Sequence, residues 1–204
     1  MRKLLMVLAL GLLAACAAGP RNSPTPEVYD FGLPAPRVVS DGRWSKVVLE
    51  IRAPYWFDSP SIEYRLLYDD PLKLRSYAGS RWAGAPGLLL SQRLRQQLGV
   101  LGGSGQAAVN CQLRLELQEF SQAFDTPQHS RGILQGSASI VDARRRVVAE
   151  WLLAVEQPAA TADARGGVRA LVAASEELGR QLASWLDELA KTGKLYDCLA
   201  SPGS

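Results

Sequence analysis

Residues that could carry out acid–base or metal chemistry are few and far apart in this sequence. His129 is the only histidine, and it stands in the polar stretch TPQHSRG, which is typical of a solvated loop rather than of a base or a metal ligand. Asp69 and Asp70 are adjacent, so a turn explains them better than paired-carboxylate catalysis does. The serines lie outside a GxSxG context. We therefore expect no enzyme activity and no metal or cofactor.

The glycine-rich stretch VLGGSGQAA could suggest a phosphate-binding loop. However, no Lys-Ser or Lys-Thr pair follows it, and the next segment has the pattern of a strand rather than of a helix. The phosphate-loop interpretation therefore fails.

Cys16 is the residue with the clearest chemical role. The chain opens MRKLLMVLALGLLAACAAGP, with Arg2 and Lys3 before an apolar run that is shorter than the ~20 residues of a spanning helix. The last four residues before and including the cysteine, LAAC, resemble a bacterial lipobox. This predicts removal of residues 1–15 and lipidation of Cys16 with acyl chains such as palmitate. An uncleaved or ordinary signal with a chance cysteine is the alternative.

A lipidated Cys16 would anchor the protein without spanning the membrane. Each methylene that an acyl chain buries in the bilayer contributes ~0.8 kcal/mol, so two or more chains give stable anchoring. The stretch AAGPRNSPTP (17–26) suits a flexible tether within residues 16–27. Ala17 follows the cysteine where an aspartate would resemble inner-membrane retention. We therefore expect the periplasmic face of the outer membrane of a Gram-negative bacterium.

The composition fits one exported domain. Without Arg2 and Lys3 the 23 basic residues fall to 21 against 20 acidic ones, and no clustered basic face indicates a nucleic-acid partner. With 47% hydrophobic residues, residues 28–197 can form one core, followed by a tail at 198–204. Cys111 and Cys198 would share an oxidising compartment, so a disulfide is possible. Two buried free thiols and, less well, a metal site are the alternatives.

Hydrophobic periodicity predicts strands that alternate with two helices. One helix would run from Pro86 to Gly99, and a longer one would follow Thr161 as N-cap and stop near Gly193. The strand candidates are residues 28–33, 46–54, 61–69, 73–79, 109–117, 132–142 and 147–157. This order predicts an α+β fold, a two-layer domain with a mainly antiparallel sheet and two main helices packed on one face.

Three features could serve either the fold or a partner. Arg144, Arg145 and Arg146 lie in a predicted hairpin, where they could meet lipid phosphates or an acidic partner, or form a soluble turn that protects strand ends. Trp185 is in register with the apolar stripe of the long helix and is expected in the core, whereas Trp151 is ambiguous. The stretch APYWFDSPSIEYR (53–65) places three aromatic residues at a turn.

The sequence resembles the family of ABC-type transport auxiliary lipoproteins, which includes the lipoprotein subunit of the paraquat-inducible Pqi system. The resemblance rests on the lipobox, YDFGL, RAPYWFDSPSIEYR and KLRSYAGSRWAGAPGLLLSQRLRQQL, in which the family has an Arg-Trp-Ala segment opening its first helix. Trp56, Phe57 and Gly84 depart from the family's usual residues. The matching positions are Tyr29, Pro54, Tyr55, Pro60, Ile62, Tyr64, Arg65, Tyr77, Arg81, Trp82 and Ala83.

This resemblance implies an accessory subunit of an MCE-type (mammalian cell entry) transporter, which moves phospholipid or other hydrophobic cargo between the inner and outer membranes. An MCE-domain protein would be the partner, and a role in membrane integrity would follow. Two alternatives are an outer-membrane assembly lipoprotein similar to the accessory component of lipopolysaccharide insertion, and a direct carrier that binds phospholipid itself.

The resemblance also divides the aromatic turn. Tyr55 follows Pro54 as the family pattern has it and is expected to pack beneath the turn. Trp56 and Phe57 are neighbours that face opposite ways in an extended chain, so one is expected to be buried and the other to be an exposed anchor for a partner or membrane.

Overall fold

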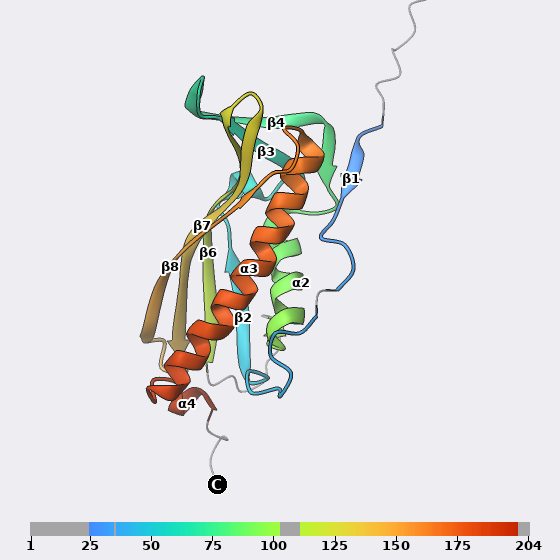
Figure 1. Ribbon diagram of the computed structural model, residues 1–204. Coiled ribbons are helices and arrows are strands. Elements are labelled where there is room, and N and C mark those ends of the chain that lie inside the picture. Colours follow the sequence, from blue (N-terminus) through green and yellow to red (C-terminus); the bar gives the residue numbers. More distant parts are fainter. Residues whose placement is uncertain (1–24, 35, 103–110, 200–204) are drawn as a thin grey trace, which may run out of the picture.

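The computed structural model describes residues 25–34, 36–102 and 111–199. The predicted signal peptide, Cys16, most of the tether, the GGSG stretch from residue 103 onward and residues 200–204 lie outside the described residues. Within the described ranges, eight strands form one mixed sheet, and two long helices cover one of its faces (Figure 1). The predicted two-layer α+β fold is confirmed.

The strands and helices follow one another in an order close to the one that periodicity predicts. The helices are α2 (Pro86–Leu98), α3 (Ala164–Lys191) and the short α4 (Tyr196–Leu199), and a single 3-10 turn, η2, spans Tyr55–Phe57. The strands are β1 (Glu27–Tyr29), β2 (Val47–Arg52), β3 (Ser61–Leu66), β4 (Asp70–Trp82), β5 (Leu101–Gly102), β6 (Cys111–Thr126), β7 (His129–Asp142) and β8 (Val147–Pro158).

Strand β6 is the central strand of the sheet. On one side it pairs antiparallel with β7, which pairs antiparallel with β8, in line with the predicted mainly antiparallel sheet. On its other side the first half of β6 pairs with β2 and the second half with β3, both parallel. Strand β4 then adds antiparallel to β3, and β1 adds parallel to β4. These parallel pairs make the sheet mixed, although its long ladders are antiparallel.

A β-bulge between Leu117 and Glu119 shifts the side-chain phase of β6. Before the bulge, alternate residues from Cys111 to Leu117 are buried; after it, every residue from Phe120 to Phe124 is buried. The extra residue lets Phe120, at an even position, join the core cluster that odd positions fill before the bulge. The strand therefore extends to Thr126, beyond the end at Leu117 that strict alternation predicts.

Helix α3 packs along the sheet through a buried stripe that includes Leu171, Leu178, Leu182 and Leu186. Its N-cap is Asp163 rather than the predicted Thr161, because the Asp163 carboxylate accepts the backbone N–H of Gly166 at 2.8 Å. Helix α2 begins at Pro86 and is closed by Gly99 in the left-handed region (φ 68°), as predicted.

Other predicted segment ends also differ in the structure, among them those of β3, β4 and β7. Arg81 and Trp82 end β4 and do not open α2. Strand β1 stops at Tyr29, because Phe31 turns into the core, where its ring lies 5.5 Å from Trp82 and 6.1 Å from Phe120. No helix within the described ranges is long and apolar enough to cross a membrane.

Trp185 packs against the core, as predicted, but it is only partly buried. Its ring is half-buried on the flank of α3, where it lies 5.7 Å from the ring of Trp151 on β8. The two tryptophans line a hollow of about 410 Å³ together with Glu177, Arg180 and Glu188. Among the described strands β8 pairs with β7 alone, so it forms an edge of the sheet beside this hollow.

Candidate functional site

The first candidate surface is the aromatic turn, residues 54–58. The backbone N–H of Phe57 donates to the Pro54 carbonyl at 2.9 Å, and that of Asp58 donates to the Tyr55 carbonyl at 3.1 Å, which closes the 3-10 turn η2. With three residues per turn, successive side chains point about 120° apart. Only one of the three rings can therefore enter the core.

The ring that enters the core is Phe57, which is 2% exposed, whereas Trp56 is 48% and Tyr55 81% exposed. The prediction that one of Trp56 and Phe57 is buried and the other exposed is confirmed. The prediction that Tyr55 packs beneath the turn is wrong, because the turn is helical and points Tyr55 to solvent. Burial also removes Phe57 from the candidate contact residues.

Tyr55 and Trp56 form an exposed aromatic pair. Their rings meet edge to face, with centroids 5.1 Å apart and planes at 80°. Phe57, one residue further, fixes the turn from below, so the pair is presented by a rigid element. Exposed aromatic rings on a fixed support are typical of interface anchors, because little conformational entropy is lost when they are covered.

The second candidate surface is the arginine hollow, a cavity of about 690 Å³ on the sheet face opposite the helices. Strands β2 and β6 supply Arg52 and Arg114, and the turn between β7 and β8 supplies Arg145. Glu50 and Asp142 line it as well, and Val48 and Val141 form an apolar floor.

Glu50 joins the two strand arginines. It accepts hydrogen bonds from Arg52 Nε at 3.0 Å and Arg114 Nε at 3.2 Å, and Gln112 Nε2 donates to it at 2.8 Å. Partial burial alone would raise the pKa of Glu50, but the bonds from Arg52 and Arg114 outweigh it and lower the pKa. One ionised carboxylate is therefore shared between two guanidinium groups.

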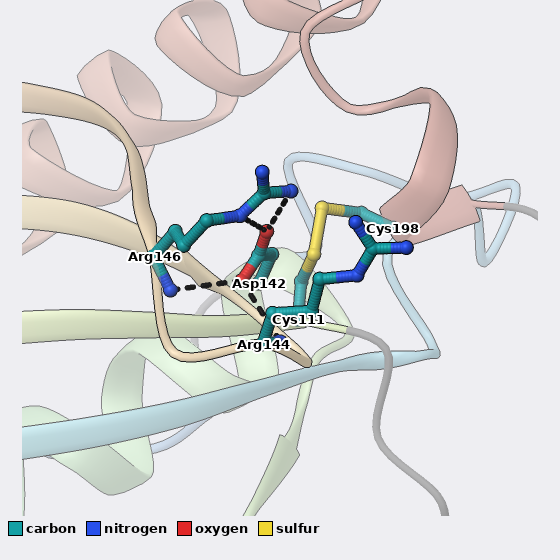
Figure 2. The surroundings of a disulfide bond; sticks show 5 residues. All are labelled: Cys111, Asp142, Arg144, Arg146 and Cys198. Carbon is teal, nitrogen blue, oxygen red and sulfur yellow. Dashed lines mark hydrogen bonds and ion pairs between the residues drawn. A yellow bond between two sulfur atoms is a disulfide. The ribbon is translucent and has the colours of Figure 1, made fainter.

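Asp142 organises the turn between β7 and β8 (Figure 2). Its carboxylate accepts the backbone N–H groups of Arg144 and Arg146 at 2.9 and 2.8 Å and the Arg146 Nε at 2.9 Å. The backbone N–H of Arg146 is the main cause that lowers the pKa of Asp142. Arg146 thus stabilises the turn, as the soluble-turn interpretation expects.

Arg144 and Arg145 are different from Arg146. Within the residues that the structure describes, their guanidinium groups form no hydrogen bond or ion pair with the protein. Arg145 also adopts the left-handed conformation, with φ 62°, which is unfavourable for a residue with a side chain. The triplet therefore contains one structural arginine and two that are available to a partner.

A disulfide lies beside this turn (Figure 2). It joins Cys111, the first residue of β6, to Cys198 in α4, with Cα atoms 5.1 Å apart. Cys111 is the register partner of Asp142, so the bond holds α4 against the strand pair that carries the arginine turn. Cys198 and Leu199 therefore belong to the folded domain, whereas the sequence places them in a tail.

The remaining candidates for chemistry do not gather into a site. His129 begins β7 rather than lying in a loop; it is exposed, and its Nδ1 lies 3.1 Å from Thr126 Oγ1. Asp69 pairs with Arg75 at 2.6 Å in the turn before β4. Among the described residues, no group of three or more histidine, cysteine or acidic residues could hold a metal ion.

The positions that carry the family resemblance have mostly structural contacts. Ile62 and Trp82 are fully buried, and the Ala83 N–H donates to the Tyr29 carbonyl at 2.6 Å. Arg65 binds Glu119 on β6 at 2.9 Å. The exposed Tyr55 is the exception among the aromatic residues of this set.

The fold is a two-layer α+β domain that carries two exposed candidate contact surfaces. Residues 29–183 match the model of the family described as the ABC-type transport auxiliary lipoprotein component. Because this match covers most of the sequence, the chain belongs to that family, whose members are auxiliary lipoproteins of ABC-type transport. A search of curated proteins found no significant match.

Solved structures share the fold. A crystal structure of a protein from Xanthomonas campestris superposes with a TM-score of 0.65 at 18% identity, covering 81% of this chain and 98% of the other. A second, described as an uncharacterized protein, gives a TM-score of 0.61 at 13% identity, with 79% and 99% covered. At these identities the likeness shows the architecture alone.

Proposed function

We propose that this protein is a lipid-anchored periplasmic accessory subunit of an MCE-type ABC transporter. It supports the movement of phospholipid or other hydrophobic cargo between the inner and outer membranes by docking to a protein partner. The partner is the MCE-domain protein of the transporter. The lipidated Cys16 holds the subunit at the periplasmic face of the outer membrane.

The exposed Tyr55–Trp56 pair is the observation that supports docking. Both rings stand outside the core on a turn that Phe57 fixes, and their edge-to-face contact limits their motion. Covering such rings with a partner removes apolar surface from water at about 25 cal/mol per Å². Trp and Tyr are also enriched among the residues that dominate binding energy.

Copurification from intact envelopes tests this function. The full-length protein, crosslinked in its own cell, should recover the MCE-domain protein, and Trp56→Ala and Tyr55→Ala should each reduce the recovery at least several-fold. Tyr68 and Tyr196 are matched controls because they are 48% and 76% exposed, close to the 48% of Trp56 and 81% of Tyr55. Tyr68→Ala and Tyr196→Ala should leave the recovery unchanged.

Other recoveries would point to other functions. If a β-barrel protein copurifies and no MCE-domain protein does, the outer-membrane assembly alternative replaces the proposal. Native mass spectra of the purified protein could instead show bound phospholipid that both aromatic substitutions leave in place. In that case the direct-carrier alternative replaces the proposal. Fractionation of the two membranes tests the predicted outer-membrane location separately.

A further inference from the structure

We infer that the arginine hollow binds an acidic segment of a partner protein, whose aspartate or glutamate carboxylates are held by the guanidinium groups of Arg144 and Arg145 together with those of Arg52 and Arg114. Arg52, Arg114 and Arg145 line the hollow, and Arg144 precedes Arg145 in the same turn. Most of this surface lies on β6 and in the turn between β7 and β8, far in sequence from the aromatic turn, although Arg52 ends β2 two residues before Pro54.

The charge of this surface favours a carboxylate-bearing ligand. The cluster contains five guanidinium groups, Arg52, Arg114 and the triplet 144–146, and two carboxylates, Glu50 and Asp142, which leaves an excess of three positive charges. Glu50 is already shared by two arginines, and Asp142 is held by Arg146 and two backbone N–H groups. The local carboxylates therefore do not neutralise Arg144 and Arg145.

The size and lining of the hollow suit a short peptide segment. Its volume of about 690 Å³ lies within the range of ligand sites in proteins. Arginine presents a planar fork that binds a carboxylate through two parallel hydrogen bonds. The buried floor of Val48 and Val141 excludes water from one side of these bonds, which strengthens them.

The position of the hollow favours a protein over the membrane that holds the anchor. The chain enters the domain at β1, at one end of the molecule, whereas α4 and the turn between β7 and β8 lie at the opposite end (Figure 1). Between these ends runs α3, whose 28 residues extend for about 42 Å. The arginine turn therefore faces away from the point where the tether enters.

The site is built before any ligand binds. Asp142 fixes the backbone of the turn, and the disulfide from Cys111 to Cys198 fixes the start of β6 below it (Figure 2). Because the backbone of the arginine turn is already fixed, binding loses little conformational entropy there, and the affinity is higher for it. For its physiological partner this inference rests on the proposed docking function, since the acidic segment would belong to the docked protein.

A defined probe tests the inference directly. The full-length protein in non-ionic micelles is titrated into a fluorescent peptide of alternating glutamate and glycine, and anisotropy reports binding. The same peptide with glutamine in place of glutamate should not bind. Added salt should weaken binding of the acidic peptide, because the contacts are between exposed charges.

Arg145→Gly is the most informative variant. Glycine adopts φ 62° more easily than arginine does, so the turn keeps its shape while the charge is lost. Combined with Arg144→Gln it should raise the Kd of the acidic peptide at least tenfold. Arg145→Lys keeps the charge but loses the fork, so it should weaken binding less. Arg169→Gln, at an exposed arginine of α3, should change the Kd less than twofold.

Three results would overturn the inference. They are equal binding of the acidic and glutamine peptides, an unchanged Kd in the double variant, and binding of phosphatidylglycerol vesicles but not of the acidic peptide. The last would assign the hollow to a lipid surface. The acidic peptide could fail to bind while the MCE-domain protein still copurifies in a way that depends on Trp56. The docking function then stands and only this inference is lost.

Discussion

The phenol of Tyr77 donates a hydrogen bond to Oε1 of Gln122 at 2.8 Å and so joins β4 to β6 beneath α3. Gln122 is fully buried, and its Nε2 donates to Ser130 Oγ on β7 at 2.8 Å. Burial raises the pKa of Tyr77, so the phenol remains a neutral donor over the whole physiological range. Three strands therefore meet at one amide.

Tyr77→Phe should destabilise the domain by about 1–3 kcal/mol, because it leaves the buried Gln122 carbonyl without a donor. Tyr64→Phe is the matched control. Its ring lies 4.6 Å from that of Tyr77, and its hydroxyl has no hydrogen-bond partner within the described part of the chain. Urea unfolding of both variants measures the change. Equal losses of unfolding free energy in Tyr77→Phe and Tyr64→Phe would contradict a stabilising role of the Tyr77–Gln122 hydrogen bond.

Gly167→Ala should destabilise the domain by roughly 1–3 kcal/mol through overpacking. A Cβ at position 167 would lie 2.0 Å from Gln122 Oε1, and this amide cannot move aside without breaking its bonds to Tyr77 and Ser130. Gly79→Ala meets nothing within 4 Å and should be nearly neutral. Thermal melts of the two variants that coincide would disprove the close approach of α3 to Gln122.

Reduction of the disulfide should lower the free energy of unfolding by about 2–5 kcal/mol, because Cys111 and Cys198 are separated by 87 positions and the open chain regains much entropy. The measurement is the urea midpoint with and without reductant. A Cys111→Ser, Cys198→Ser double variant should start at the lower midpoint and not respond to reductant. If the urea midpoint of the wild type is the same with and without reductant, the disulfide does not stabilise the domain as expected.

The N-cap of α3 should make stability depend on acid pH. The backbone N–H of Gly166, followed by the hydroxyl of Thr161, lowers the pKa of Asp163. A lowered folded-state pKa adds stability above the unfolded value of about 3.9, and this stability is lost as the pH falls through the folded-state value. Asp163→Ala should therefore cost about 1 kcal/mol at pH 7 and less below pH ~4.

Asp163→Asn separates the hydrogen bond from the charge, since asparagine also caps helices but does not titrate. Its stability should stay closer to that of the wild type at pH 7. If Asp163→Ala lowers the free energy of unfolding equally at pH 3 and pH 7, the Asp163 carboxylate is not the cause of the pH dependence.

The sequence predicts the elements of this fold better than their details, and single residues show why. Leu90, Leu94 and Leu98 repeat at helical spacing, so α2 was predictable with both ends. The bulge after Leu117 was not, because it depends on how β7 pairs across Glu119. Asp163 displaces Thr161 as N-cap by two positions, a difference that depends on where the chain leaves β8.

The candidate site was predictable only in part. The sequence identifies Trp56, the arginine triplet and the cysteine pair as residues of interest. The hollow itself combines β2, β6 and a turn that are far apart in sequence, so nothing local indicates that Arg52 and Arg114 face Arg145. Tyr55 was misplaced because its position beneath the turn was taken from the family resemblance, whereas the 3-10 turn points its ring to solvent.

Trp56→Ala and Phe57→Ala should behave in opposite ways although the residues are neighbours. Phe57 fills the core, so its truncation should cost about 3–5 kcal/mol. Truncation of the half-exposed Trp56 should lower the free energy of unfolding much less, because it leaves no cavity in the core. Unfolding curves measure both losses; equal large losses would show that Trp56 is a structural residue and not a docking one.

The most direct test of docking places a photo-crosslinking residue, p-benzoylphenylalanine, at position 56 of the full-length protein in its own cell. The control carries it at position 68, whose tyrosine is equally exposed. Docking through Trp56 predicts a crosslinked product with the MCE-domain protein from position 56 and little or none from position 68. The absence of that product at position 56, or its equal yield at both positions, would contradict the proposed docking surface.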